Sequence, residues 1–411
     1  MVYLQVLLEQ IIINPNKNNQ MMRSKYKKII LVILISFTGI EMVGQEQLYV
    51  DATATGINNG ASWKDAYTKI TDAIASAEAN STIHIAKGTY TGNVSSTAIT
   101  IDKSLTLIGG YPTGGGTANH FENETILDGS KKRRVVNITK ASKLIGLIIQ
   151  NGKETDYDGA GLRIASSSTL EDCVIRNNHT SKDSEGEVKG GGIYSAFSLK
   201  MINCKVVGNS VSSNSSFKNI VKGGGVFVRG TLLAINSLFL KNIANSDSGN
   251  AYGSGIYASK QTELINCLIT RNLAKSNNEA IGAGLYASGT VGSSSRAIRL
   301  KNSVLWENMV STDGGKKLVT GEYSINGPSE DYFSAVNSLV KGEYLEGYGN
   351  INDKSNKFNP HFANPAYDDF RLMANSKLID SGREKYNKTT IDLAGNNRVS
   401  GRIDIGPYES K

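Results

Sequence analysis

The residues of this sequence that could do chemistry are paired carboxylates and regularly spaced lysines. Asp156 and Asp158 stand two residues apart in a polar loop, where carboxylate oxygens can hold Ca²⁺. Lys189 and Lys222 precede consecutive small-residue triplets, so a repeating fold would stack them. They could act as bases, but without carboxylate partners we expect them to be surface lysines. The repeat offers almost no carboxylate aligned with them, so we expect no catalytic residue. Asp156 and Asp158 are weak calcium candidates, and a solvated acidic loop is the alternative.

A column of aromatic residues is the second candidate site. An aromatic residue stands four positions after the start of each of four triplets, at Tyr194, Phe227, Tyr257 and Tyr286. If each repeat is one coil, neighbouring rings lie about 4.8 Å apart and form a flat ladder that could contact sugar rings. The alternatives are that the rings only stabilise one another, or that polar loops cover them. These loops are residues 179–189, 210–222, 243–252 and 273–281.

The elements that would position these residues follow from an internal repeat. Its triplets are Gly159-Ala160-Gly161, Gly190-Gly191-Gly192, Gly223-Gly224-Gly225, Gly253-Ser254-Gly255 and Gly282-Ala283-Gly284. The steps between them are 31, 33, 30 and 29 residues, a period typical of stacked structural units. A helical repeat is excluded, because each glycine would cost a helix about 1 kcal/mol.

Each repeat also contains an alternating apolar run, a small residue and an asparagine. The small residues are Cys173, Cys204, Ser237, Cys267 and Ser303, and we expect them to point inward as one column, with the thiols free. The asparagines five residues later should form a structural turn ladder: Asn178, Asn209, Asn242, Asn272 and Asn308. The pattern predicts an all-β fold, a right-handed parallel β-helix with an N-terminal capping helix.

The ends of the chain differ from the repeat. A basic start and an apolar stretch predict a secretory signal with its core at 22–44, within a leader at 1–45. Residues 46–96 would form the N-terminal cap, with a helix that begins at Ser62 and buries Ala66, Ile70, Ile74 and Ala77. We expect β-helix coils at 97–310, then irregular last coils and a C-terminal closing segment at 311–411.

Composition narrows the range of partners. The net charge of +8 is spread along 411 residues, and the single dense basic run, Lys131 to Arg134, has no stacking aromatics near it. We therefore expect no nucleic-acid partner. We also expect no stable membrane span in the mature chain, no cofactor other than possible Ca²⁺, and a monomer. The scattered histidines and three cysteines do not have the spacing of a zinc site.

The head, tail and repeat units carry a family resemblance. Leu48-Tyr49-Val50-Asp51 and Ala86-Lys87-Gly88-Thr89-Tyr90 resemble the opening of secreted bacterial β-helix proteins of the pectin-lyase-like superfamily. The tail, Asp392 to Asn396 and Asp404 to Glu409, is similar to the end of its choice-of-anchor Q group. Units such as Gly190 to Tyr194 resemble polymorphic outer-membrane-protein repeats. The resemblance covers most of residues 46–409 and implies a β-helix in a superfamily that includes polysaccharide lyases and glycoside hydrolases.

These observations favour a secreted, extracellular or cell-surface protein. We expect a non-catalytic adhesion or glycan-binding role, with a polysaccharide or cell-surface glycan as the partner. A polysaccharide lyase or glycoside hydrolase acting on acidic polysaccharide is one alternative, and a structural envelope component is another. The fold would support any of the three.

Overall fold

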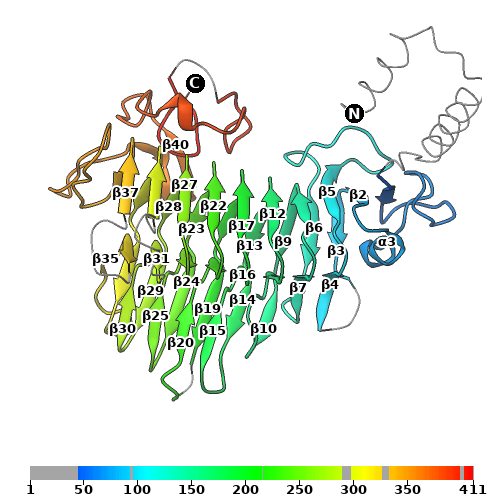
Figure 1. Cartoon of the computed structure of the whole chain (residues 1–411), viewed down its shortest axis with the longest axis horizontal. Coiled ribbons are helices and arrows are strands. Elements are labelled where there is room, and N and C mark those ends of the chain that lie inside the picture. The colour runs from blue at the N-terminus through cyan, green and yellow to red at the C-terminus, as the bar shows by residue number, and fades with distance from the viewer. Residues whose placement is uncertain are drawn as a thin grey trace, which may run out of the picture. The chain divides into compact units, whose positions relative to one another are not determined.

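Alternating burial along very short strands builds the fold. In β12 (Ser168–Glu171), Ser168 and Leu170 are buried while their neighbours are partly exposed, and β17 (Leu199–Ile202) pairs with β12 in parallel register. The same pairing continues from coil to coil, so that the strands stack into long parallel sheets (Figure 1). In this register inward side chains stack on like side chains. The chain is the predicted right-handed parallel β-helix.

The computed structural model describes residues 45–92, 96–214, 216–288, 298–325, 333–398 and 402–410. The chain divides into a unit of residues 1–46 and a unit of residues 47–411, and the β-helix is the second of these. The predicted secretory core at 22–44 lies outside the described residues. Within those residues, no helix has both the length and the apolar character needed to cross a membrane.

Three parallel sheets, named A, B and C here, form the walls of the β-helix. Sheet A contains β1 (Gln47–Val50), β2 (Thr82–Ala86), β5 (Thr106–Tyr111), β8 (Lys143–Ile145), β12, β17, β22 (Leu232–Ile235), β27 (Thr262–Ile265), β32 (Ile298–Lys301) and β37 (Phe333–Val336). Sheet B contains β3 (Gly88–Tyr90), β6 (Thr125–Asp128), β9 (Leu147–Gln150), β13 (Val174–Arg176), β18 (Lys205–Val207), β23 (Leu238–Leu240), β28 (Leu268–Thr270), β33 (Val304–Trp306) and β38 (Leu339–Val340). Sheet C contains β4 (Thr97–Ile101), β7 (Arg134–Ile138), β11 (Leu162–Ile164), β16 (Ile193–Ser195), β21 (Val226–Val228), β26 (Ile256–Ala258), β31 (Leu285–Ala287) and β36 (Tyr323–Ile325).

The four segments expected as polar loops form two further sheets instead. Sheet D contains β10 (Lys153–Thr155), β14 (His179–Ser181), β19 (Ser210–Ser213), β24 (Ile243–Ser246), β29 (Leu273–Ser276), β34 (Met309–Ser311) and β35 (Val319–Thr320). Sheet E contains β15 (Glu187–Lys189), β20 (Ile220–Lys222), β25 (Asn250–Tyr252) and β30 (Glu279–Ile281). Small apolar residues such as Val211, Val221, Ala244 and Ala251 pack together between these strands. The prediction of loops was wrong because these short strands bury only one or two small residues each, which gives a weak apolar pattern in the sequence.

The glycine triplets turn the chain sharply before each sheet C strand. Gly190 has φ +69°, a left-handed conformation that glycine adopts without strain. A Cβ at Gly192 would lie 2.6 Å from the carbonyl oxygen of Gly225 in the next coil, closer than atoms can approach. The first and third residues of a triplet are therefore glycine for different reasons, conformation and close coil spacing.

The predicted asparagines lie in one buried column beside the core. Each side-chain amide donates to the Oδ1 of the asparagine in the next coil, at 2.8–3.1 Å, from Asn178 through Asn209, Asn242 and Asn272 to Asn308. The same oxygens also accept backbone N–H groups. Asn308 donates in turn to the buried carboxyl of Glu322, which ends the column. These hydrogen bonds satisfy polar groups that coil stacking would otherwise bury unpaired.

A second polar column occupies the turn between sheets A and B. Its residues all have positive φ, from +46° to +52°: Asp172, Asn203, Asn236, Asn266, Asn302 and Asn337. The small residues that follow them point inward and are buried, and Cys173, Cys204 and Cys267 are free thiols. Burial raises the pKa of the Cys267 thiol to about 12. These cysteines act as small packing residues.

The N-terminal helix is shorter than predicted. Helix α3 spans Ile70–Ser76, whereas Ser62 and Asp65 form a hydrogen-bonded turn in which Asp65 N–H donates to Ser62 Oγ at 3.1 Å. The expected apolar stripe of the helix is buried, including Ile70 and Ile74. The capping-box spacing produced its local hydrogen bonds without starting a helix there. Strands β1 and β2 of the same region already belong to sheet A.

The C-terminal segment runs back along the turn between sheets A and B. The asparagine side chains of that turn donate to it in reverse chain order: Asn337 to Ser381 O, Asn302 to Arg383 O, Asn266 to Asn387 Oδ1 and Asn236 to Ile391 O. The antiparallel pair β39 (Phe362–Asn364) and β40 (Asp369–Leu372), with the short 3₁₀ helices at Pro365–Tyr367 and Glu384–Tyr386, belongs to this segment. Its apolar residues, such as Phe370, Leu393 and Ile405, cover the outer face of sheet B.

Candidate functional site

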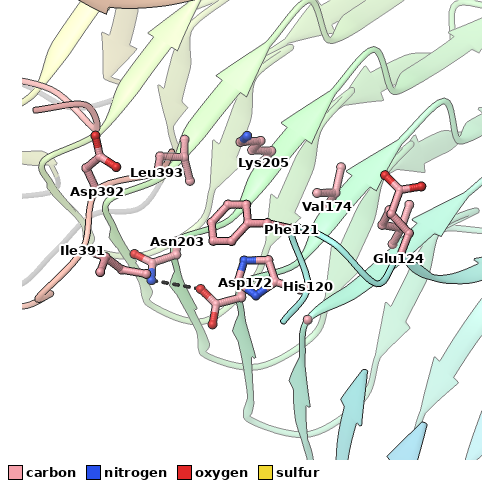
Figure 2. Close-up of a pocket in the computed structure, with 12 residues that line it drawn as sticks. His120, Phe121, Glu124, Asp172, Val174, Asn203, Lys205, Ile391, Asp392 and Leu393 are labelled. Carbon is pink, nitrogen blue, oxygen red and sulfur yellow. Dashed lines mark hydrogen bonds between the residues drawn. The ribbon is translucent and has the colours of Figure 1, made fainter. Parts of the chain in front are cut away.

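An open pocket remains on the outer face of sheet B where this C-terminal covering stops. The outward row of sheet B runs from Val174 through Lys205 to Leu238, and Leu238 is already buried under the C-terminal segment. The pocket has a volume of about 170 Å³. It is lined by His120, Phe121, Glu124, Gly146, Ile148, Asp172, Val174, Asn203, Lys205, Ile391, Asp392 and Leu393 (Figure 2). Three distant parts of the sequence therefore meet at one place.

The loop between β5 and β6 supplies His120 and Phe121. Asn119 N–H donates to the carbonyl of Gly110 at 2.7 Å, which folds the loop back on its own strand. Gly110 has φ +87°, and a Cβ there would lie 2.9 Å from the backbone nitrogen of His120. The Phe121 ring is 52% exposed and its centre lies 4.1 Å from that of His120. The loop thus presents an imidazole at the pocket and an accessible aromatic ring at its rim.

The turn between sheets A and B supplies Asp172 and Asn203. Asn203 donates from Nδ2 to Asp172 Oδ1 at 3.0 Å, and Figure 2 shows His120 beside that carboxyl. Burial raises the pKa of Asp172, although the Asn203 hydrogen bond and the charge of His120 act in the opposite direction. Burial lowers the pKa of His120, with Asp172 opposing the shift and Lys205 adding to it. The two groups are therefore held closer to their neutral forms than exposed groups would be.

Lys205 projects from β18 into the same pocket. Burial lowers the pKa of its ammonium, and the charge of Asp392 partly offsets that effect. Among the described residues, no carboxylate lies within ion-pair distance of Lys205. Asp392 is 1% exposed, and its oxygens accept the amides of Ala394, Asn396 and Glu409. Asp392 thus anchors the C-terminal segment, while the ammonium of Lys205 stays available to a ligand.

This arrangement can bind an anion and exchange protons with it. A partly desolvated ammonium attracts a carboxylate more strongly than an exposed one does, because less water screens the pair. Titratable groups with shifted pKa values that meet in a concave site are typical of functional sites. The described residues contain no group of three or more His, Cys, Asp or Glu side chains that could hold a metal ion.

The predicted aromatic ladder forms, but its rings are largely covered. Ring centres lie 5.4 Å apart between Tyr194 and Phe227 and 5.1 Å apart along the rest of the column. Phe227, Tyr257 and Tyr286 are at most 6% exposed, and Tyr194 is half-buried.

The cover comes from sheet E. The ammonium groups of Lys189 and Lys222 lie over rings of the ladder, at 5.8 Å from the centre of Phe227 and 5.4 Å from that of Tyr257. The ring of Tyr252 packs against the last tyrosine. Glycan contact through the ladder remains a prediction, and we place the candidate site elsewhere because these rings offer a ligand little surface.

The calcium candidates lie apart from the pocket and bind protein groups. Asp156 accepts the backbone N–H groups of Asp183 and Ser184, which lower its pKa to about 2. Asp158 accepts the N–H of Lys189 at 2.8 Å, and burial raises its pKa. Both carboxylates therefore fix local loops. Calcium binding at this pair stays a prediction.

Sequence reasoning missed the residues that the pocket brings together. Asp172 has the positive φ of a turn residue, +52°, but it is also the one carboxyl in a column of asparagines. Lys205 is a cation in an outward row that otherwise holds Val174, Leu238 and Leu268. These two departures from the repeat were signals that could have singled out Asp172 and Lys205. His120 carries no such signal, because it stands in a loop outside the repeat.

The comparisons with known proteins give distant likenesses. No family model matches the sequence, and no curated protein matches it. The structure resembles that of the pectate lyase Pel9A, with 15% identity and a TM-score of 0.47, over 90% of this chain and 98% of that chain. It also resembles a pectin methylesterase from Aspergillus niger, with 15% identity and a TM-score of 0.34, over 77% of this chain and 89% of that chain. Likenesses this distant carry no argument about activity.

Proposed function

We propose that the protein binds an acidic polysaccharide outside the cell, at the pocket on the outer face of sheet B. The observation that carries this proposal is the meeting of Lys205, His120 and Asp172 in an open pocket with the exposed ring of Phe121 at its rim. A carboxylate of the ligand pairs with Lys205. The Phe121 ring packs against the C–H face of a sugar, and Asn203 and Asp172 exchange hydrogen bonds with its hydroxyl groups.

The charge arrangement supports an acidic ligand over a neutral one. A buried or half-buried cation without an ion-pair partner is costly, and an anionic ligand relieves that cost. Asp392 neutralises part of this charge only from a distance, since its oxygens are occupied by backbone amides. A secretory signal at 22–44, as the sequence predicts, would place the protein where such polysaccharides occur.

A second candidate function is cleavage of the same ligand by β-elimination. Burial lowers the pKa of Lys205 and raises that of Asp172, and these are the directions that a base and an acid require. Lys205 would take the proton next to a uronate carboxylate, the bond to the glycosidic oxygen would break, and Asp172 or His120 would protonate that oxygen. A double bond would remain in the product sugar.

One screen separates these functions. The purified protein is mixed with acidic and neutral polysaccharides, with and without Ca²⁺, and bound fraction, unsaturated products and reducing ends are recorded together. Binding of acidic polysaccharides without product supports an adhesion or glycan-binding role, and an unsaturated product supports the lyase. No binding and no product on any acidic polysaccharide contradicts both.

A variant locates the site. Lys205→Met keeps the volume of the side chain beside Val174 and Leu238 but removes the charge. Loss of one charge-assisted contact should weaken binding roughly 10- to 100-fold. Lys200→Met is the matched control, because Lys200 is exposed on the outer face of sheet A.

A further inference from the structure

A second and larger pocket lies farther along the outer face of sheet B. Its volume is about 390 Å³. The last coils provide its inner wall, and the segment that leads into β39 and β40 provides its outer wall. It is lined by Trp306, Glu307, Lys341, Phe358, Asn359, Pro360, His361, Phe362, Pro365 and Met373. It shares no lining residue with the first pocket, and the apolar C-terminal covering of Leu268 and Val304 lies between the two.

The walls of this pocket are held by specific contacts. Phe358 N–H donates to Asp353 Oδ1 at 2.8 Å, and the Phe358 ring meets Trp306 edge-on with 6.3 Å between centres. His361, at φ +52°, redirects the chain, and its ring accepts or donates a hydrogen bond with Asn375 at 3.2 Å. The outer wall is therefore fastened to the last coil rather than lying loosely over it.

Charged and polar groups gather on the inner wall. The Lys341 ammonium lies 4.6 Å from the centre of the Trp306 ring and 3.8 Å from a Glu307 oxygen. Arg271 lies 3.2 Å from the other Glu307 oxygen and also donates to the carbonyl of Pro365. Two cations thus share one carboxylate, which leaves a net positive charge at this wall. The indole N–H of Trp306 has no hydrogen-bond partner among the described residues and is not fully enclosed, so it can donate to solvent or to a ligand.

We propose that this pocket binds one acidic sugar unit of a polysaccharide, independently of the first pocket. The inference rests on the proposed function, since it gives the same class of ligand a second point of attachment. Lys341 pairs with the carboxylate of the sugar, and the Trp306 N–H donates to one of its oxygens. The volume admits a ring with its substituents, and Phe358 and Met373 supply apolar contact for the C–H groups.

Ligand binding in this pocket can be followed by tryptophan emission, because the chain contains few tryptophans. The sequence contains two tryptophans, Trp63 and Trp306. Trp63 packs against Tyr49 and Tyr111 at the N-terminal end, so Trp63→Phe keeps an aromatic ring there and leaves Trp306 as the only indole. The emission of Trp306 is then recorded while galacturonic acid oligomers are added, with neutral galactose oligomers as the comparison.

The expected result is a saturable change of Trp306 emission with the acidic oligomers alone. Adding Lys341→Met should weaken that response about tenfold or more, and Lys341→Arg should largely restore it. Lys205→Met should leave it unchanged. Emission spectra and circular dichroism without ligand verify that each variant is folded.

The outcomes separate this inference from the proposed function. An unchanged Trp306 emission, while the protein still binds acidic polysaccharide through Lys205, overturns the inference alone. An equal response to neutral oligomers, or loss of the response in Lys205→Met, also overturns it. Absence of acidic polysaccharide binding by any measure overturns the proposed function as well.

Discussion

The buried carboxyl at the end of the asparagine column should make the stability of the protein depend on pH. Glu322 is 4% exposed and accepts the N–H of Asn308 at 3.2 Å together with its side-chain amide. Burial raises the pKa of this carboxyl to about 8, because the cost of a buried charge outweighs these hydrogen bonds. We expect Glu322→Gln, which stays neutral at every pH, to remove a pH-dependent loss of stability.

The magnitude follows from the difference between the folded and unfolded pKa. The unfolded carboxyl has its ordinary pKa of 4.5, so between that value and about 8 the folded state retains a proton that the unfolded state has released. Stability from this group is therefore complete at low pH and declines as the pH rises toward 8. At 1.36 kcal/mol per pKa unit, the decline amounts to roughly 3–5 kcal/mol. Glu322→Gln should match the wild type within about 1 kcal/mol at pH 5 and exceed it by most of that amount at pH 8.

The assay is urea unfolding of both proteins at pH 5 and pH 8, followed by circular dichroism. Comparison of variant with wild type cancels the other groups that titrate in this range, such as Glu409, whose pKa burial raises to about 7. Glu185→Gln, at an exposed position, is the control and should leave the pH dependence unchanged. If Glu322→Gln loses as much stability as the wild type between the two pH values, ionisation of the buried Glu322 carboxyl is not the cause of that loss.

Three further predictions concern packing. Asn242→Ala should destabilise the protein by about 2–4 kcal/mol in urea unfolding, because it removes the acceptor of two buried Asn209 N–H groups and the side-chain donor to Val206 O and Asn272 Oδ1. Exposed Asn214→Ala should change stability by less than about 0.5 kcal/mol. Phe227→Ala should cost about 3 kcal/mol by removing the second ring of the stacked column, and a cost below about 0.5 kcal/mol would mean that the rings do not pack as described. The third prediction concerns the buried thiols of Cys173, Cys204 and Cys267. They should resist a thiol reagent in the native protein and react after unfolding, and fast labelling of the native protein would contradict their burial.

The stacked columns could be predicted from the sequence because coil stacking places equivalent residues on one another. An asparagine that recurs once per coil must lie above its counterpart, so Asn178 to Asn308 could be aligned before any coordinates. The same holds for the Cys173 column and for the ring column at Tyr194. Covering of the rings by these segments was one of the alternatives that the sequence offered. That the segments do so as the strands of sheet E could not be predicted, because those strands contribute residues as small as Ala251 and Ala280.

The pocket could not be predicted because tertiary packing of unrelated segments makes it. His120 comes from a loop outside the repeat, Lys205 from a central coil, and Asp392 from the C-terminal segment. Their approach depends on the path of that segment along the asparagine turns, which no local pattern encodes. The helix prediction was wrong at Ser62 for a related reason, since a capping-box spacing fixes a turn but does not decide whether a helix follows it.

The most direct test of the account is the affinity of the protein for an acidic polysaccharide, measured by calorimetric titration of the wild type, Lys205→Met and Lys200→Met. The account predicts measurable binding by the wild type and by Lys200→Met, and binding weakened roughly 10- to 100-fold in Lys205→Met. Equal binding by all three proteins would show that the polysaccharide does not bind at the Lys205 pocket. A wild type that binds no acidic polysaccharide would contradict the proposed function itself.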